Sequence, residues 1–170
     1  MITRVEAIKL FEETGCASNV IEHCEEVASL AYEIANKVKE KGHEINPELA
    51  YLGALLHDFG RCYTHAISHA VEGFELAKAR GIDSEVSEII KRHIGAGISK
   101  EEARYIGLPE DDYFPRSLEE KIVAHADNLV KGTKRITIEE RMALMRRNKV
   151  SKKVIKRVQK LAEEIDELSN

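Results

Sequence analysis

From residue 46 to residue 61 the chain reads NPELAYLGALLHDFGR. Asn46 is a typical helix N-cap, and Pro47 suits the first helical position, where its missing N–H costs no hydrogen bond. The segment 48–58 is then apolar on nearly all sides until its last two residues. A helix of that kind belongs in the middle of a bundle, because every face must be covered. This stretch therefore predicts a helical protein built around one central, buried helix.

Helical periodicity extends over nearly all of the remaining chain, and no stretch alternates convincingly as a β-strand would. Before and after the central helix we expect a helix over 3–14, a long helix capped by Ser18 that runs to about Lys41, a helix over about 67–80, and a helix that Asp83 opens and that ends near Gly95. Three further helices begin with the capping boxes Ser99/Glu102, Ser117/Glu120 and Thr137/Glu140. A last helix starts at Ser151, and its apolar residues follow heptad spacing. Its length favours closing the bundle over pairing with a partner chain. The predicted fold class is all-α, a single-domain helical bundle.

Composition excludes several classes of protein. The chain has 170 residues, of which 43% are hydrophobic and 33% charged, as expected of one ordinary globular domain. No stretch approaches the run of about 20 apolar residues that a membrane helix needs, and the N-terminus lacks the apolar core of a secretion signal. The three cysteines, Cys16, Cys24 and Cys62, form no CxxC pair, so we expect neither a disulfide framework nor a zinc ribbon. These features predict a cytoplasmic, reduced protein without a membrane partner.

Positive charge is concentrated near the C-terminus. Residues 134–160 carry 11 Lys and Arg against 2 Asp and Glu, a net charge of +9, whereas residues 1–133 carry a net charge of −9. A basic stretch of this kind either covers a helix with solvated charge or meets a polyanion. It lacks interleaved aromatic residues for base stacking, which counts against a single-strand binder. We therefore expect no nucleic-acid partner.

Polar residues on apolar faces point to a site inside the bundle. His57 and Asp58 end the most buried helix, although a helix C-terminus followed by a turn would also explain this pair. His23 shares a helix face with Val27, and Asp127 falls on an apolar face of a later helix. Two histidines and two aspartates facing inward fit the ligand set of a divalent metal. Otherwise, several independent buried polar side chains would each need a separate explanation.

Two more histidines stand between these residues in the sequence. His69 opens a helix and is followed four residues later by Gly73, where a small residue permits close approach. His93 ends another helix and follows Ile89 by four residues, which places it on the core side.

The ordered set His23, His57-Asp58 and Asp127 on an all-helical chain resembles the HD superfamily of metal-dependent phosphohydrolases. The resemblance spans about residues 18–132. His-Asp-Phe-Gly, together with His69-x-x-x-Gly73 and His93, is similar to the HDIG-type subgroup, with phenylalanine in place of the usual isoleucine. The segments around His57, His93 and Asp127 also resemble a small, largely uncharacterised archaeal HDIG group. This implies one HD-type domain over residues 1–170, with a core of about 18–132 and basic C-terminal helices, 137–168, packing on it.

The resemblance also implies the chemistry of the site. His23, His57, Asp58 and Asp127 would hold a first divalent metal, and His69 and His93, with Asp58 bridging, a second. Imidazoles and carboxylates suit Mn, Fe, Co, Ni or Zn. Two such cations can share a hydroxide and neutralise the phosphoryl oxygens that it attacks. Asp58 and His57 are accordingly the residues expected to be essential for catalysis.

Three further residues are candidates for substrate binding. Arg61 and Lys131 lie next to proposed ligands and suit a phosphate group, with ordinary surface charge as the alternative. His65 precedes His69 by four residues and would share its face if the helix started early; otherwise it is a loop histidine.

The predicted function is hydrolysis of a phosphomonoester or phosphoanhydride, in the first place of a nucleotide. The alternative is a metal- or nucleotide-binding regulatory HD domain with little turnover. The expected partner is a small phosphorylated substrate, and a homodimer is compatible with the sequence.

Overall fold

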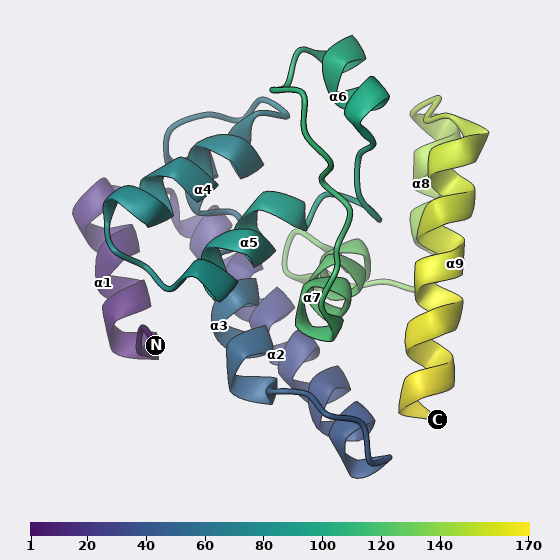
Figure 1. Ribbon diagram of the computed structural model, residues 1–170, viewed down its shortest axis with the longest axis horizontal. Helices are drawn as coiled ribbons and strands as arrows, with labels where there is room; N and C mark the ends of the chain where they lie inside the picture. Colours follow the sequence, from purple (N-terminus) through teal and green to yellow (C-terminus); the bar gives the residue numbers. More distant parts are fainter.

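Helix α3 (Pro47–Leu56) forms the centre of the fold, and eight of its ten residues are buried. The Asn46 side chain accepts hydrogen bonds from the backbone N–H groups of Glu48 and Leu49, as the N-cap signal predicts. Helices α2, α5 and α7 pack around α3 (Figure 1). The central helix predicted from the sequence is thus confirmed.

The structure, a computed structural model, describes residues 1–170 and is all-α apart from one small hairpin. Its elements are α1 (Arg4–Thr14), α2 (Ser18–Glu40), α3, the 3₁₀ helix η1 (Phe59–Cys62), α4 (His69–Ala79), α5 (Ser84–Arg92), α6 (Lys100–Ile106), α7 (Leu118–Asn128), the strands β1 (Val130–Lys131) and β2 (Lys134–Arg135), α8 (Ile138–Arg147) and α9 (Lys152–Ser169). One cluster of 31 buried hydrophobic residues extends from α1 to α9. No helix is both long and apolar enough to cross a membrane.

Several predicted helix boundaries are shifted. Ser18 is the first residue of α2 rather than its cap, and no side chain caps that helix. Helix α3 ends at Leu56, two residues before Asp58, because the backbone tightens there into η1. Helix α4 begins at His69 rather than at residue 67. Ser117 caps α7, but the Glu120 side chain accepts from the N–H of Arg116 instead of completing the capping box.

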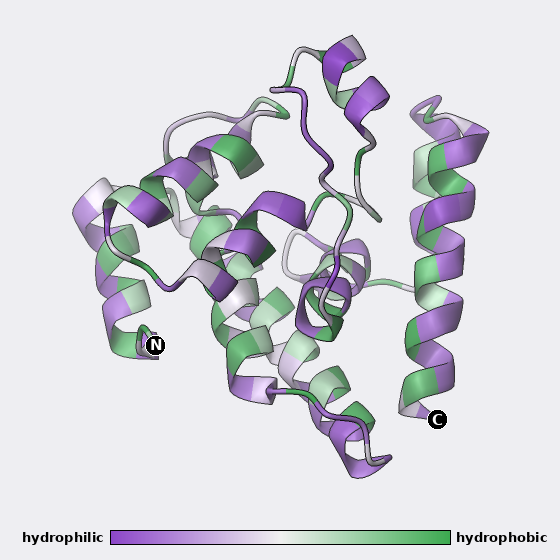
Figure 2. Cartoon of the chain, viewed as in Figure 1, coloured by the Kyte–Doolittle hydropathy of each residue, from purple (hydrophilic) through white to green (hydrophobic).

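Helix α9 closes the bundle, as predicted. Val158, Leu161 and Ile165 of its apolar seam are buried, and the helix packs on α7 and α2. Figure 2 shows hydrophobic and hydrophilic stretches alternating along its ribbon, as expected of an amphipathic helix. Helix α8 packs against α9 and has no fully buried residue. The sequence analysis missed the antiparallel hairpin β1–β2, because two-residue strands are too short to show alternation.

The cysteine expectation is wrong for one pair. Cys16, in the turn after α1, forms a disulfide with Cys62, the last residue of η1, and only Cys24 is free. The two bonded residues are 46 positions apart, so their pairing follows from the packing of α1 on η1 and not from a local motif. The disulfide ties the α1–α2 turn to the short helix that follows Asp58.

Gly60 of η1 and Gly73 of α4 allow these two elements to touch through their backbones. A Cβ atom at Gly60 would lie 1.9 Å from the carbonyl oxygen of His69, and one at Gly73 would lie 2.9 Å from the backbone N of Gly60. The close approach expected at Gly73 is therefore present, and Gly60 is its partner. Through this contact Asp58, just before η1, is placed beside His69, at the start of α4.

We expect Gly60→Ala to lower the free energy of unfolding by about 2–3 kcal/mol, because overpacking against backbone cannot be relieved by rotating a side chain. Urea denaturation of the metal-free protein measures this change. Glu75→Ala, at an exposed position of α4, is the control and should leave the unfolding midpoint nearly unchanged. A Gly60→Ala protein as stable as the wild type would show that the contact is not tight.

Candidate metal centre

Six polar side chains converge where α2, α3, α4, α5 and α7 meet. His57 is the C-cap of α3, and Asp58 is the N-cap of η1. His69 is the first residue of α4, His93 is the C-cap of α5, and Asp127 lies in the last turn of α7. The sixth, His23, belongs to the second turn of α2. The structure thus brings together all six residues that the resemblance implied as metal ligands.

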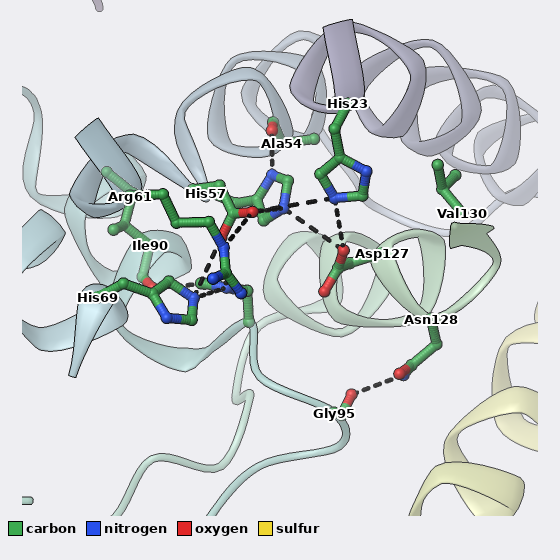
Figure 3. Close-up of polar contacts among 12 residues, drawn as sticks. His23, Ala54, His57, Arg61, His69, Ile90, Gly95, Asp127, Asn128 and Val130 are labelled. Carbon is green, nitrogen blue, oxygen red and sulfur yellow. Dashed lines mark hydrogen bonds and ion pairs between the residues drawn. The ribbon is translucent and has the colours of Figure 1, made fainter. Parts of the chain in front are cut away.

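Four of these residues form the first half of the cluster. The Nε2 atoms of His23 and His57 lie 3.1 Å and 3.5 Å from Oδ1 of Asp127. The same two atoms lie 3.9 Å and 3.7 Å from Oδ2 of Asp58. Two imidazoles and two carboxylates therefore point at a common centre (Figure 3).

The second half of the cluster uses the other oxygen of Asp58. His69 Nε2 lies 3.1 Å from Asp58 Oδ1, and His93 Nε2 lies 3.5 Å from it. The two Nε2 atoms are 3.2 Å apart. The Asp58 carboxylate therefore stands between two groups of imidazoles, with one oxygen directed to each.

Each of the four histidines points its Nδ1 atom at a backbone carbonyl. His57, His69 and His93 use the carbonyl three residues earlier, that of Ala54, Ala66 and Ile90, at 2.6, 2.8 and 2.8 Å. His23 uses the carbonyl of Gly132 in the β1–β2 turn, at 2.6 Å. A carbonyl only accepts, so Nδ1 carries the proton in every case. In the neutral ring Nε2 then presents its lone pair to the centre of the cluster.

This arrangement fits metal ions. In the neutral tautomers the Nε2 lone pairs of His69 and His93 face one another, and those of His23 and His57 face carboxylate oxygens, so the cluster needs positive charge, supplied by protons or by bound cations. His57 Nε2 and Asp58 Oδ1 are buried without a hydrogen-bond partner. Buried polar atoms of this kind require an explanation, and histidines that bind metal through one nitrogen and donate from the other are its usual form.

The neighbouring imidazoles determine the pKa values of the two aspartates in the cluster. Burial raises the pKa of the Asp58 carboxyl, but His57, His69 and His93 outweigh burial and hold its pKa well below the usual range. Burial also raises the pKa of the Asp127 carboxyl, but the neighbouring imidazoles of His23 and His57 outweigh burial and keep its pKa below the usual range. Both aspartates are therefore carboxylates, as metal binding requires.

The pKa values of His57 and His93 are shifted in opposite directions. Burial lowers the pKa of His57, but the Asp58 carboxylate more than offsets it, so the pKa is raised well above its usual value. Burial keeps the pKa of His93 below its usual value and favours the neutral ring.

A cleft of about 360 Å³ opens on the first half of the cluster, lined by His23, Asp58, Asp127, Arg61, Lys131 and Arg141 among others. Arg61 Nε donates to Asp58 Oδ2 at 2.7 Å, and Lys131 is exposed at the rim. His65 is exposed in the loop before α4 and does not line the cleft. Because α4 starts only at His69, His65 shares no helix face with it.

Sequence reasoning missed the residues that fasten α7. Arg141 of α8 donates from Nε to the carbonyl of Asn128 at 2.6 Å, and from Nη2 to that of Val130 at 2.7 Å. The first bond satisfies a carbonyl left open at the C-terminus of α7, and the second holds β1, so together they help to position Asp127. No sequence signal could have identified Arg141, or the Gly132 carbonyl, because backbone acceptors are present at every residue.

The geometry agrees with the comparison to known families. A family model for the HD domain matches residues 20–132. The chain belongs to the HD-domain family. The all-α fold and the resemblance to the HD superfamily are thereby confirmed.

Relatives of this HD domain include a protein of similar length and longer enzymes. An uncharacterized protein of Methanocaldococcus jannaschii is 55% identical over 125 residues, which is 74% of each chain. A tRNA (cytidine(56)-2'-O)-methyltransferase of Picrophilus torridus is 41% identical over 163 residues, covering 96% of this chain but 46% of the methyltransferase. A ribonuclease Y of Acidothermus cellulolyticus is 37% identical over 87 residues, 50% of this chain and 17% of the ribonuclease. The chain therefore spans less than half the length of the two named enzymes.

A solved structure shows the same fold. The HD domain of the Listeria monocytogenes phosphodiesterase PgpH superposes with a TM-score of 0.56 at 17% identity, covering 96% of this chain and 99% of that one. A second structure of that domain contains cyclic-di-AMP.

We expect His69→Ala and His93→Ala each to lower the metal content of the purified protein from two ions per chain towards one. Each change removes an Nε2 ligand from the second half of the cluster but leaves His23, His57, Asp58 and Asp127 in place. Elemental analysis after loading with Mn²⁺ and desalting measures the content. His65→Ala is the matched control and should bind as much metal as the wild type. Unchanged content in both ligand variants would show that the site holds a single ion.

Proposed function

We propose that this HD domain is a metal-dependent phosphohydrolase acting on a phosphomonoester or phosphoanhydride, in the first place that of a nucleotide. The observation that carries the proposal is the Asp58 carboxylate between two pairs of histidines whose Nδ1 protons are all committed to backbone carbonyls. When bound, divalent cations supply Lewis acidity towards phosphoryl oxygens and lower the pKa of water.

The protein residues contribute charge and position. Asp58 and Asp127 remain ionised, and the Asp127 side chain is 24% exposed, so it faces the cleft through which substrate enters. Arg61 is held by its bond to Asp58, and its terminal nitrogens make no protein hydrogen bond, so they are available to a phosphate. Lys131 provides a second cationic group at the rim. His57 lies beside both carboxylates, with Nε2 3.7 Å from Asp58 and 3.5 Å from Asp127, and would direct this atom at a metal that they share.

A phosphate ester of RNA is the second candidate substrate. Support comes from the names of the relatives, which include tRNA methyltransferases and ribonuclease Y. The methyltransferase activity itself is not carried over, because this chain covers only part of those enzymes. The predicted basic segment is consistent with either substrate. Two of its cations, Arg135 and Arg157, are ion-paired within the protein, whereas four others are exposed and unpaired: Arg146, Arg147, Lys152 and Lys153.

We expect Asp58→Ala to abolish phosphate release from a nucleotide panel in the presence of Mn²⁺, because it removes the carboxylate shared by both halves of the cluster. Circular dichroism checks that the variant is folded. Asp112→Ala, at an exposed position outside the cleft, should retain full activity. If Asp58→Ala kept more than about a tenth of the wild-type turnover, a mechanism that depends on two metals would be wrong. Tight nucleotide binding by the wild type without phosphate release would instead support the regulatory alternative.

Neutralising the four exposed cations to glutamine tests the choice of substrate. If the substrate is a small nucleotide, kcat/KM should stay almost unchanged, because these side chains do not line the metal cleft. If the substrate is RNA, kcat/KM should fall several-fold at low salt, and the loss should shrink near about 0.5 M salt, where exposed charges are screened within about 4–5 Å. We expect the first result, and a salt-dependent loss confined to RNA would contradict it.

A further inference from the structure

An apolar groove lies next to the metal cleft and takes no part in the chemistry described so far. It has a volume of about 620 Å³. Most of its lining residues come from α6, the loop that follows α5, and the junction of α8 with α9, elements whose arrangement is seen in Figure 1. Its exposed walls are mainly apolar, formed by Ile67, Ile94, Ile98, Ile106, Met145 and Val154, while Glu101, Glu102, Ser151 and Arg157 also line it. Tyr105 lines the rim and is 93% exposed.

The groove and the metal cleft share part of their walls. Gly95 and Met145 line both hollows. The Gly95 carbonyl accepts a hydrogen bond of 2.7 Å from Asn128 Nδ2, and Asn128 follows Asp127 directly (Figure 3). The wall between the two hollows is therefore fastened to the helix that carries a proposed metal ligand. The two hollows are therefore neighbours, separated by Gly95 and Met145.

The two hollows differ in polarity along this path. The cleft contains carboxylates and the cationic groups of Arg61, Lys131 and Arg141. The groove contains one cation, Arg157, and it is already paired with Glu102 at 2.9 Å. An anionic group therefore fits only at the cleft end, whereas the groove suits a flat, uncharged ring that buries its faces against aliphatic side chains. Its volume lies within the range of about 300–1,000 Å³ typical of small-molecule sites.

We propose that the groove binds the base of the nucleotide whose phosphate lies in the metal cleft, with Tyr105 stacking on that base. The proposal rests on the proposed function, since it identifies the part of the substrate that lies beyond the phosphate. Tyrosine offers a rigid aromatic face at low entropic cost, and base–aromatic stacking tolerates any base because every base has a π-face. Met145 adapts to the shape of the ring, because its unbranched side chain is flexible.

Calorimetric titration of the Mn²⁺-loaded protein tests this assignment without turnover. The ligand is an adenosine monophosphate analogue in which a CH₂ group replaces the bridging ester oxygen, and its partner is the corresponding ribose analogue without a base. We expect Tyr105→Ala to weaken binding of the adenosine analogue about 5- to 10-fold. Tyr105→Phe should restore it, and the ribose analogue should bind equally to all three proteins.

Tyr32→Ala is the matched control, because Tyr32 is a partly exposed tyrosine on α2 that lines neither hollow. This variant should bind both analogues like the wild type. Equal affinity of wild type and Tyr105→Ala for the adenosine analogue would overturn the proposal, as would an equal loss for both analogues. Base-dependent binding in a protein that releases no phosphate would retain the groove assignment and reject only the proposed hydrolysis.

A further arm distinguishes a free nucleotide from the end of an RNA chain. A trinucleotide ending in adenosine is titrated in parallel with the adenosine analogue. The ligand whose base reaches the groove is the one whose affinity falls in Tyr105→Ala. Sedimentation velocity of the wild type and of Tyr105→Ala tests whether a second copy of the chain occupies the groove instead. If Tyr105→Ala changed only the oligomeric state and left both affinities unchanged, the groove would be a contact between two copies of the chain and the proposal would be wrong.

Discussion

The structure depends on four hydrogen bonds from histidine Nδ1 atoms to backbone carbonyls. His23, His57, His69 and His93 each direct the Nδ1 proton to a carbonyl, so their Nε2 atoms converge on two ionised aspartates. Lone pairs and carboxylates gathered in a buried space repel one another unless cations are present. The two carboxylates and the imidazole nitrogens gathered at this point form a donor set that suits divalent cations.

The rest of the fold holds this point in place. The apolar helix α3 delivers His57 to the centre, and its neighbours α2, α5 and α7 bring one ligand each. Backbone contact between Gly60 and Gly73 places Asp58 beside His69, while Arg141 closes the end of α7 next to Asp127. Each of these supports acts on backbone, which moves less than a side chain. The geometry of the cluster is therefore preorganised, as an effective metal site requires.

Sequence patterns predicted most of the helices, because periodicity and caps are local properties. They also singled out the six clustered residues, but the resemblance to the HD superfamily was needed to join all six into one site. The clustered histidines were recognisable because each lies at a helix end or on an apolar face, where a polar side chain requires an explanation. The Cys16–Cys62 disulfide, the β1–β2 hairpin and the role of Arg141 were not predictable, since they arise from backbone groups and residues that meet only after folding. His65 shows the same limit, because its relation to His69 depends on where α4 begins.

The most direct test of this account is a long-range ¹H–¹⁵N spectrum of the histidine rings, recorded as diamagnetic Zn²⁺ is added. Four of the seven histidines should keep a protonated Nδ1 throughout the titration, while their Nε2 resonances shift to the position of metal-bound nitrogen. His43 and His65 lie outside the cluster and should not change at these metal concentrations. Coordination through Nδ1, or Nε2 resonances that do not respond to metal, would contradict the arrangement on which the proposed function depends.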